Sequence, residues 1–149
     1  MRTSRPELNS LALSATAHCL VGCAIGEFAG MVIATSLGWS DAASIALAVG
    51  LAYLVGFGLT ARPLLGAGLA AGAVISTAIA ADTISITIME VIDNAFVAVV
   101  PGAMDAGLGD ALIYTSIAGG FAIAFPFAFL ANRHMIARGK GCCPHARQA

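Results

Sequence analysis

Four long apolar runs constrain the fold of this chain more strongly than any other feature of its sequence. They cover residues 11–38, 42–60, 64–100 and 111–131, with polar breaks at residues 39–41, 62–63 and 101–105. About 20 apolar residues suffice for a helix to cross a bilayer, so each run can span it. A composition of 59% hydrophobic and 10% charged residues also favours a membrane protein. We therefore expect an all-α, polytopic membrane protein in which residues 1–149 form a single membrane domain.

The basic residues predict how the chain lies in the membrane. If the third run crosses once, all seven Lys and Arg residues fall on one side, which the positive-inside rule makes cytoplasmic. They are Arg2, Arg5, Arg62, Arg133, Arg138, Lys140 and Arg147. We predict four transmembrane helices with both termini cytoplasmic, preceded by residues 1–10 and followed by a basic tail, residues 134–149. The third run would measure about 55 Å as one helix. It therefore predicts a tilted extension, a break near Asp82 or a short re-entrant piece.

The first apolar run carries a stripe of polar side chains. Cys19, Cys23 and Glu27 recur at every fourth position, so they drift only about 80° around a helix. Thiolate and imidazole are ligands that suit copper(I) or zinc, and His18 adds an imidazole. His18 points roughly 100° away from Cys19, which favours a supporting role or a contact with another subunit. The alternative is that the cysteines are small apolar fillers and His18 a packing residue.

Three glycines form a ridge beside this stripe. Gly22, Gly26 and Gly30 follow the Gly-x-x-x-Gly spacing that lets another backbone approach closely in a membrane. We expect the ridge to pack against a neighbouring helix, and a homo-oligomer to complete the site there.

An acidic face on the third run complements the stripe. Asp82, Met89 and Asp93 fall within about 20° of one another on a helix, with Glu90 and Asn94 beside them. Carboxylates at membrane depth are typical of cation or proton pathways, so Asp82, Glu90 and Asp93 are candidate pathway residues and Met89 a candidate soft ligand. The alternative is that Glu90, Asp93 and Asn94 lie solvated in the outer interface.

Two further segments carry sulfur groups. Cys142, Cys143 and His145 in the tail form a composition that can bind a soft metal. Alternatives for this tail are contact with anionic lipid or S-palmitoylation. Met104 is a candidate soft ligand at an entrance, although packing is the commoner role of such a methionine.

Other function classes lack sequence support. The chain has no nucleophile elbow, phosphate-binding glycine loop, zinc-protease motif or dinucleotide fingerprint, so we do not expect an enzyme. Its few basic residues form no organised patch for nucleic acid.

Three motifs together resemble a known family. They are His18-Cys19-x-x-Gly22-Cys23-x-x-Gly26-Glu27, Asp82-Thr83-x-Ser85-Ile86-x-x-Met89-Glu90-x-x-Asp93-Asn94 and Pro101-Gly102-Ala103-Met104-Asp105-Ala106. The chain is similar over most of its length to the prokaryotic domain-of-unknown-function family 4396. The resemblance implies a four-helix protein of the bacterial inner membrane and no established activity. The Cys-Cys-Pro-His tail departs from the His-containing tail of the family.

These patterns lead to three functional hypotheses. The first is a membrane protein that binds and transports a soft transition-metal cation, with copper(I) favoured over zinc. The second is a scaffold or accessory subunit without transport, and the third is a proton-coupled carrier of a small solute. Expected partners are the lipid bilayer, further copies of the chain, and a metal chaperone or accessory membrane protein.

Overall fold

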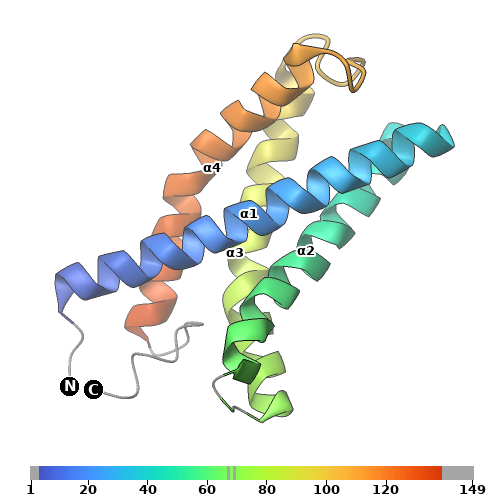
Figure 1. The fold of residues 1–149 in the computed structure, drawn as a ribbon. Coiled ribbons are helices and arrows are strands. Elements are labelled where there is room, and N and C mark those ends of the chain that lie inside the picture. The colour runs from blue at the N-terminus through green and yellow to red at the C-terminus, as the bar shows by residue number, and fades with distance from the viewer. Residues whose placement is uncertain (1–3, 67, 69, 139–149) are drawn as a thin grey trace.

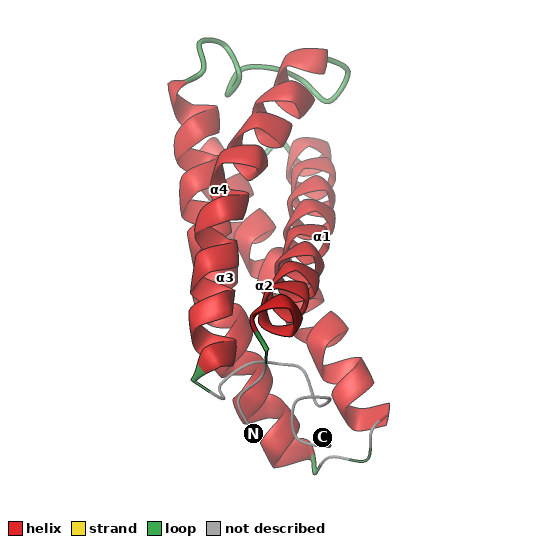
Figure 2. Cartoon of the chain, turned by 90° about the vertical axis from the view of Figure 1, so that its left-hand side faces the viewer, coloured by secondary structure: helices red, strands yellow, loops and turns green. Residues whose placement is uncertain are grey.

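The regular structure of the chain is helical. The computed structural model describes residues 4–66, 68 and 70–138. Within these ranges the chain forms four helices and no strands (Figure 2). They are α1 (Arg5–Leu37), α2 (Asp41–Gly66), α3 (Ala71–Val99) and α4 (Ala111–Ala137). The helices run alternately up and down, so α1 and α3 share one direction (Figure 1).

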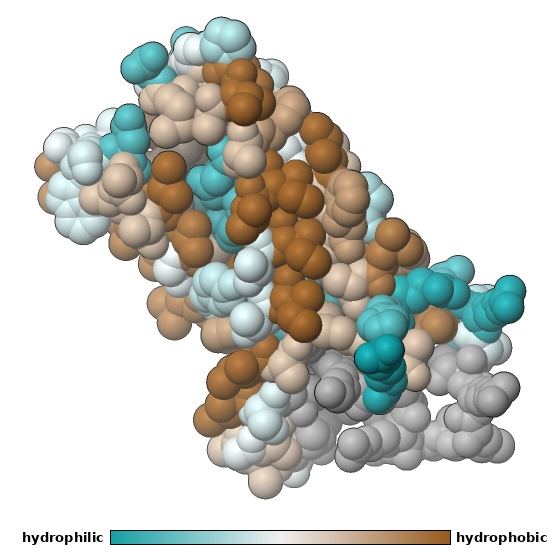
Figure 3. Space-filling model, turned by 180° about the vertical axis from the view of Figure 1, so that it is seen from behind, coloured by the Kyte–Doolittle hydropathy of each residue, from teal (hydrophilic) through white to brown (hydrophobic). Residues whose placement is uncertain are grey.

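All four helices of the described chain are long and apolar enough to cross a membrane. The 26 residues of α2, the shortest helix, measure about 39 Å, which exceeds a hydrocarbon core of about 30 Å. Large apolar side chains such as Leu54, Ile75 and Val91 are exposed on the outer faces. Figure 3 shows hydrophobic side chains along the helices, whereas hydrophilic side chains gather mainly at their ends. The chain is therefore a helical, multi-pass membrane protein.

The ends of α1 and α4 extend beyond the apolar runs. Ser4 caps α1 because its hydroxyl accepts from the Glu7 N–H at 3.4 Å, while the Glu7 carboxylate accepts from the Ser4 N–H at 2.9 Å. Gly38 ends the helix in the left-handed region, at a φ of 65°. Most of the predicted N-terminal segment is thus helical, and residues 134–137 of the predicted tail belong to α4.

The boundary between the second and third helices lies inside the third apolar run and not before it. α2 continues to Gly66 and α3 begins at Ala71, so the break predicted at residues 62–63 is wrong. α3 then continues for 29 residues without interruption. The predicted break near Asp82 and the predicted re-entrant piece are therefore wrong as well. Burial removes the need for a break, because Asp82 is enclosed by neighbouring helices instead of facing lipid.

The glycine ridge of α1 packs against α2 of the same chain. A Cβ atom at Gly26 would lie 2.2 Å from the Ala52 nitrogen, and one at Gly30 would lie 2.5 Å from Ala48 Cα. Only glycine allows such an approach, because a side chain would overlap the facing backbone. The ridge is therefore occupied within the chain, and the prediction that a second copy completes a pathway at this ridge is wrong.

α3 and α4 form a second hairpin that also packs through glycine. A Cβ atom at Gly119 would lie 2.8 Å from the Phe96 ring, and one at Gly120 would fall on the Asp93 carboxylate. The hairpins cross in Figure 1, where α1 passes in front of α3. This crossing brings the polar stripe of α1 to the acidic face of α3.

Charged side chains separate between the two ends of the bundle. One end holds the start of α1 and the end of α4, and the other holds the loop between α3 and α4 (Figure 1). Arg62, Arg133 and Arg138 lie at helix ends of the first. Asp41 and Asp110 lie at helix starts of the second, and Asp105 lies in its loop. The Arg133 guanidinium donates to the Asn9 side-chain oxygen at 2.7 Å, which ties α4 to α1 at the basic end.

Candidate functional site

Three polar side chains of α1 face the interior of the bundle. Cys19, Cys23 and Glu27 are 5%, 0% and 7% exposed. α3, which α1 crosses, contributes its own buried acids, Asp82, Glu90 and Asp93, to the same interior. We call these six side chains the α1–α3 ladder, with the rungs Cys19/Asp82, Cys23/Glu90 and Glu27/Asp93.

The first rung lies toward the basic end of the bundle. The Cys19 thiol donates to Asp82 Oδ1 at a distance of 3.9 Å between sulfur and oxygen. Thr60 of α2 lies beside the Asp82 carboxylate, and Ser85 lies beside the Cys19 thiol. The second carboxylate oxygen, Asp82 Oδ2, has no hydrogen-bond partner among the described residues.

The second rung joins a thiol to a glutamate. Cys23 lies beside Glu90 near the middle of the bundle. The Asn94 amide donates to Glu90 Oε2 at 3.4 Å and to the Glu90 main-chain oxygen at 2.9 Å. Asn94 thus orients one carboxylate oxygen, while Oε1 of the same group finds no partner in the described part of the chain.

The third rung pairs two carboxyl groups. Glu27 of α1 lies beside Asp93 of α3. Gly120 of α4 leaves the room that Asp93 occupies, because a Cβ atom there would also lie 2.9 Å from Asp93 Cα. Glu27 Oε2 and both oxygens of Asp93 lack a partner within the described ranges. Two carboxylates placed together in this way cannot both remain ionised without a balancing charge.

The ladder as a whole gathers four carboxyl groups in the buried interior of the bundle. Five carboxylate oxygens are buried without a hydrogen bond among the residues that the structure describes. An ionised carboxylate at membrane depth costs about 3 kcal/mol or more when it is isolated. A proton or a mobile cation can provide the charge that this part of the chain does not provide. The ladder therefore offers buried oxygen and sulfur donors that can hold a proton or a cation.

The alternative that Glu90, Asp93 and Asn94 lie solvated in the outer interface is wrong for the two acids. Glu90 is 4% exposed and Asp93 is fully buried, and only Asn94 is partly exposed. α4 covers Asp93, and this cover could not be deduced from the periodicity of α3 alone.

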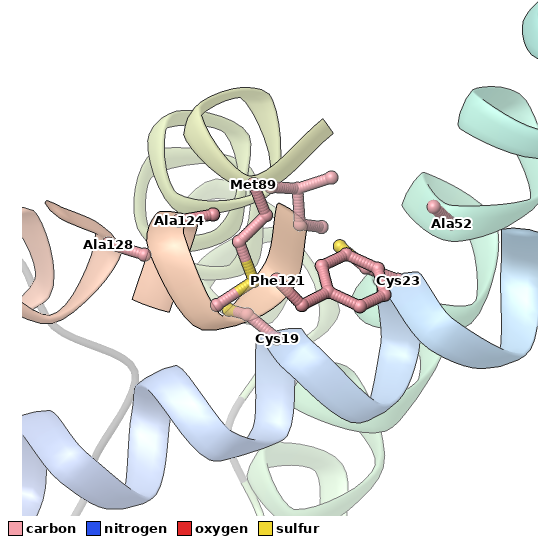
Figure 4. Close-up of a cluster of buried hydrophobic side chains, with 8 residues drawn as sticks. Cys19, Cys23, Ala52, Met89, Phe121, Ala124 and Ala128 are labelled. Carbon is pink, nitrogen blue, oxygen red and sulfur yellow. The ribbon is translucent and has the colours of Figure 1, made fainter. Parts of the chain in front are cut away.

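Sulfur groups lie within the same core. Cys19, Cys23 and Met89 belong to one buried cluster with Phe121. Figure 4 shows both thiols projecting from α1 toward Met89 of α3 and Phe121 of α4. Within the described ranges, no three His, Cys, Asp or Glu side chains form a group that could hold a metal ion. The ladder therefore offers donors rung by rung instead of one closed coordination shell.

The remaining predicted metal ligands do not join this cluster. His18 is exposed on α1 and does not join the buried cluster. This placement agrees with the angular argument that separates His18 from Cys19. Cys142, Cys143 and His145 lie outside the described residues.

The sequence reasoning missed a buried amide that links three helices. Asn132 of α4 donates to the Thr16 hydroxyl of α1 at 2.9 Å and to the Ser85 hydroxyl of α3 at 3.0 Å. Ser85 in turn lies beside Cys19, so the amide holds the hydroxyl that supports the first rung. The sequence feature that could have identified Asn132 is its position directly after the last apolar run, because an amide there is expected to form hydrogen bonds with other helices. No sequence feature indicated that Thr60 would lie beside Asp82.

A small cavity lies above the third rung, toward the acidic end. Glu27 and Asn94 line it from α1 and α3, and Met104 lines it from the loop that follows α3. Figure 3 shows hydrophilic side chains set back between the upper parts of the helices on the rear face. The cavity thus connects the ladder to the acidic end of the bundle.

Comparison with known proteins gives one family. The sequence model of the family described as Domain of unknown function (DUF4396) matches residues 9–141. The chain belongs to the DUF4396 family. The resemblance inferred from the three motifs is therefore confirmed, and the match includes the whole α1–α3 ladder. No curated protein and no solved structure matches this DUF4396 chain.

Proposed function

We propose that this DUF4396 protein binds a cation inside the helix bundle and moves it across the membrane along the α1–α3 ladder. The observation that carries the proposal is the set of five buried carboxylate oxygens without a partner in the described chain. A scaffold needs no such groups, because apolar or hydrogen-bonded side chains pack helices at lower cost. Rungs at successive turns of α1, where this helix crosses α3, give a bound cation several positions inside the bundle.

The donor types favour copper(I) over zinc as the transported cation. Two thiols and one thioether share the buried cluster, and soft sulfur ligands select copper(I). A structural zinc site needs four ligands in a tetrahedral arrangement, whereas each rung provides two side chains. A site with few donors also suits transport, since a cation must leave it as well as bind.

The charge separation supports an orientation in the membrane. We place the basic end, with both termini, in the cytoplasm because Lys and Arg accumulate on that side. The acidic end then faces outward in a bacterial inner membrane, where carboxylates attract cations. The Cys142/Cys143/His145 tail would meet the cation or its chaperone inside.

Copper(I) binding by purified protein tests the proposal. Cys142→Ser and Cys143→Ser are introduced first, so that tail thiols do not contribute. This background protein should compete for copper(I) with a chromogenic chelator, and adding Cys19→Ser and Cys23→Ser should weaken binding at least about tenfold, or 1.4 kcal/mol.

Vesicles complete the test. Background protein in liposomes should carry copper(I) inward faster than empty liposomes, and Glu27→Gln should slow it. Negligible binding by the background protein, or equal binding after the Cys19/Cys23 changes, would overturn the soft-metal assignment. Binding without any transport would favour a non-transporting accessory subunit.

The Glu27/Asp93 pair favours one second candidate, a proton-coupled carrier. Adjacent buried carboxyl groups can share and release a proton. A carrier of this kind predicts solute uptake driven by a pH gradient without added copper, and Glu27→Gln should remove that dependence. A pH-independent flux that requires copper(I) would contradict this candidate.

A further inference from the structure

The cavity above the third rung has a composition distinct from that of the ladder. It measures about 130 Å³ and lies among all four helices and the loop after α3. Two thioethers, Met31 and Met104, line it together with Glu27 and Asn94. Asp41 lies at its rim on the exposed end of α2. Sulfur, carboxylate and amide groups thus meet at the end of the bundle where a cation would arrive.

An unpartnered carboxylate forms part of the wall. Glu27 is nine-tenths buried, lines the cavity, and its Oε2 has no hydrogen-bond partner among the described residues. Thioethers are uncharged, so the buried carboxyl group of the lining is that of Glu27, which lies beside Asp93. A carboxylate without a hydrogen-bond partner is stabilised by a cation bound next to it.

The size of the cavity favours an ion over a drug-sized organic ligand. Pockets for drug-sized organic ligands measure roughly 300–1,000 Å³. A volume of about 130 Å³ has room for a partly hydrated ion, since each water takes about 30 Å³ in the liquid. Methionine sulfur prefers soft cations such as copper(I) and silver(I).

We infer that this cavity is a capture site, in which Met31 and Met104 bind a soft monovalent cation and pass it to Glu27 at the third rung. The inference rests on the proposed function for the direction of movement, whereas binding at the two thioethers can be measured without transport. Half-burial of Met31 against the Val97/Ala103/Ile113 cluster holds one thioether in place. Met104 is exposed enough to meet the cation first.

Silver(I) is the probe for this site, because it is soft, monovalent and not redox active under the assay conditions. A variant with all four cysteines changed to serine removes the thiols as competing ligands. It should retain one silver(I) per chain, and adding Met31→Leu and Met104→Leu should weaken binding at least about tenfold. Met135→Leu, a buried methionine of α4 away from the cavity, is the matched control and should bind as the parent does.

Methionine footprinting repeats the test in wild-type protein, in case the cysteine-free variant does not fold. Silver(I) should slow peroxide oxidation of Met31 and Met104 at least about threefold, with Met135 unchanged. Protection of Met31 and Met104 without transport in vesicles would support the capture site and overturn the proposed transport. The capture site alone would be overturned if copper(I) is transported while Met31 and Met104 stay unprotected from peroxide, and if the two leucine changes leave silver(I) binding unaffected.

Discussion

The contact between Gly26 and α2 allows a prediction whose magnitude follows from the structure. In Gly26→Ala the new Cβ would lie 2.2 Å from the Ala52 nitrogen, 2.3 Å from Ala52 Cα and 2.7 Å from the Leu51 carbonyl carbon. Ordinary contacts of a Cβ atom begin at 3.4 Å. The facing atoms are backbone, so no side-chain rotation relieves the overlap. α1 and α2 must therefore separate by about 1 Å.

The cost combines strain and lost packing. Overpacking a close contact costs about 1–3 kcal/mol, and separation of the helices also weakens the contacts at Gly22 and Gly30. Alanine regains up to about 1 kcal/mol from its better helix propensity. We expect Gly26→Ala to lower the free energy of unfolding by about 2 kcal/mol, close to a 30-fold change in the folded-to-unfolded ratio.

Titration from mild detergent into SDS measures this effect. Trp39, the only tryptophan of the chain, lies in the connection that joins α1 to α2. Its fluorescence should therefore change when the two helices separate. Gly50→Ala and Gly58→Ala are matched controls, because a Cβ at either position of α2 meets nothing within 4 Å. They should be neutral or stabilising by up to about 1 kcal/mol. A Gly26→Ala protein as stable as these controls would refute the packing of α1 on α2.

Two further predictions concern the support of the ladder. Gly120→Ala should displace the Asp93 carboxylate, because its Cβ would overlap that group, and should reduce copper(I) transport in vesicles far more than Gly107→Ala in the open loop. If Gly120→Ala transports copper(I) as fast as Gly107→Ala does, Asp93 is not needed for transport and the role of the third rung is contradicted. Asn132→Leu removes two interhelical hydrogen bonds and should lower stability in SDS titration by about 1 kcal/mol. Thr16→Val in the Asn132→Leu background should then cost less than in wild type, and additive losses would show that the bond between them is absent.

Helical periodicity was sufficient to group the candidate residues within each helix. Angular spacing places Cys19, Cys23 and Glu27 on one side of α1, and the interior of the bundle receives that side. It also separates His18, which is exposed. It could not show that both Met89 and Glu90 are buried, because the two point about 100° apart and burial depends on which helices cover them.

The sequence by itself determined that this is a helical membrane protein with four spans and polar stripes on the first and third. Run length and apolar content decide spanning, and residue spacing decides position around one helix. The tertiary structure decided which faces meet. α2 covers the glycine ridge, α4 encloses Asp93 through Gly120, and Asn132 bonds to α1 and α3. These relations depend on how helices rotate and cross, which is set by close packing between residues distant in sequence. That packing turns two separate stripes into the α1–α3 ladder with a cavity above its third rung.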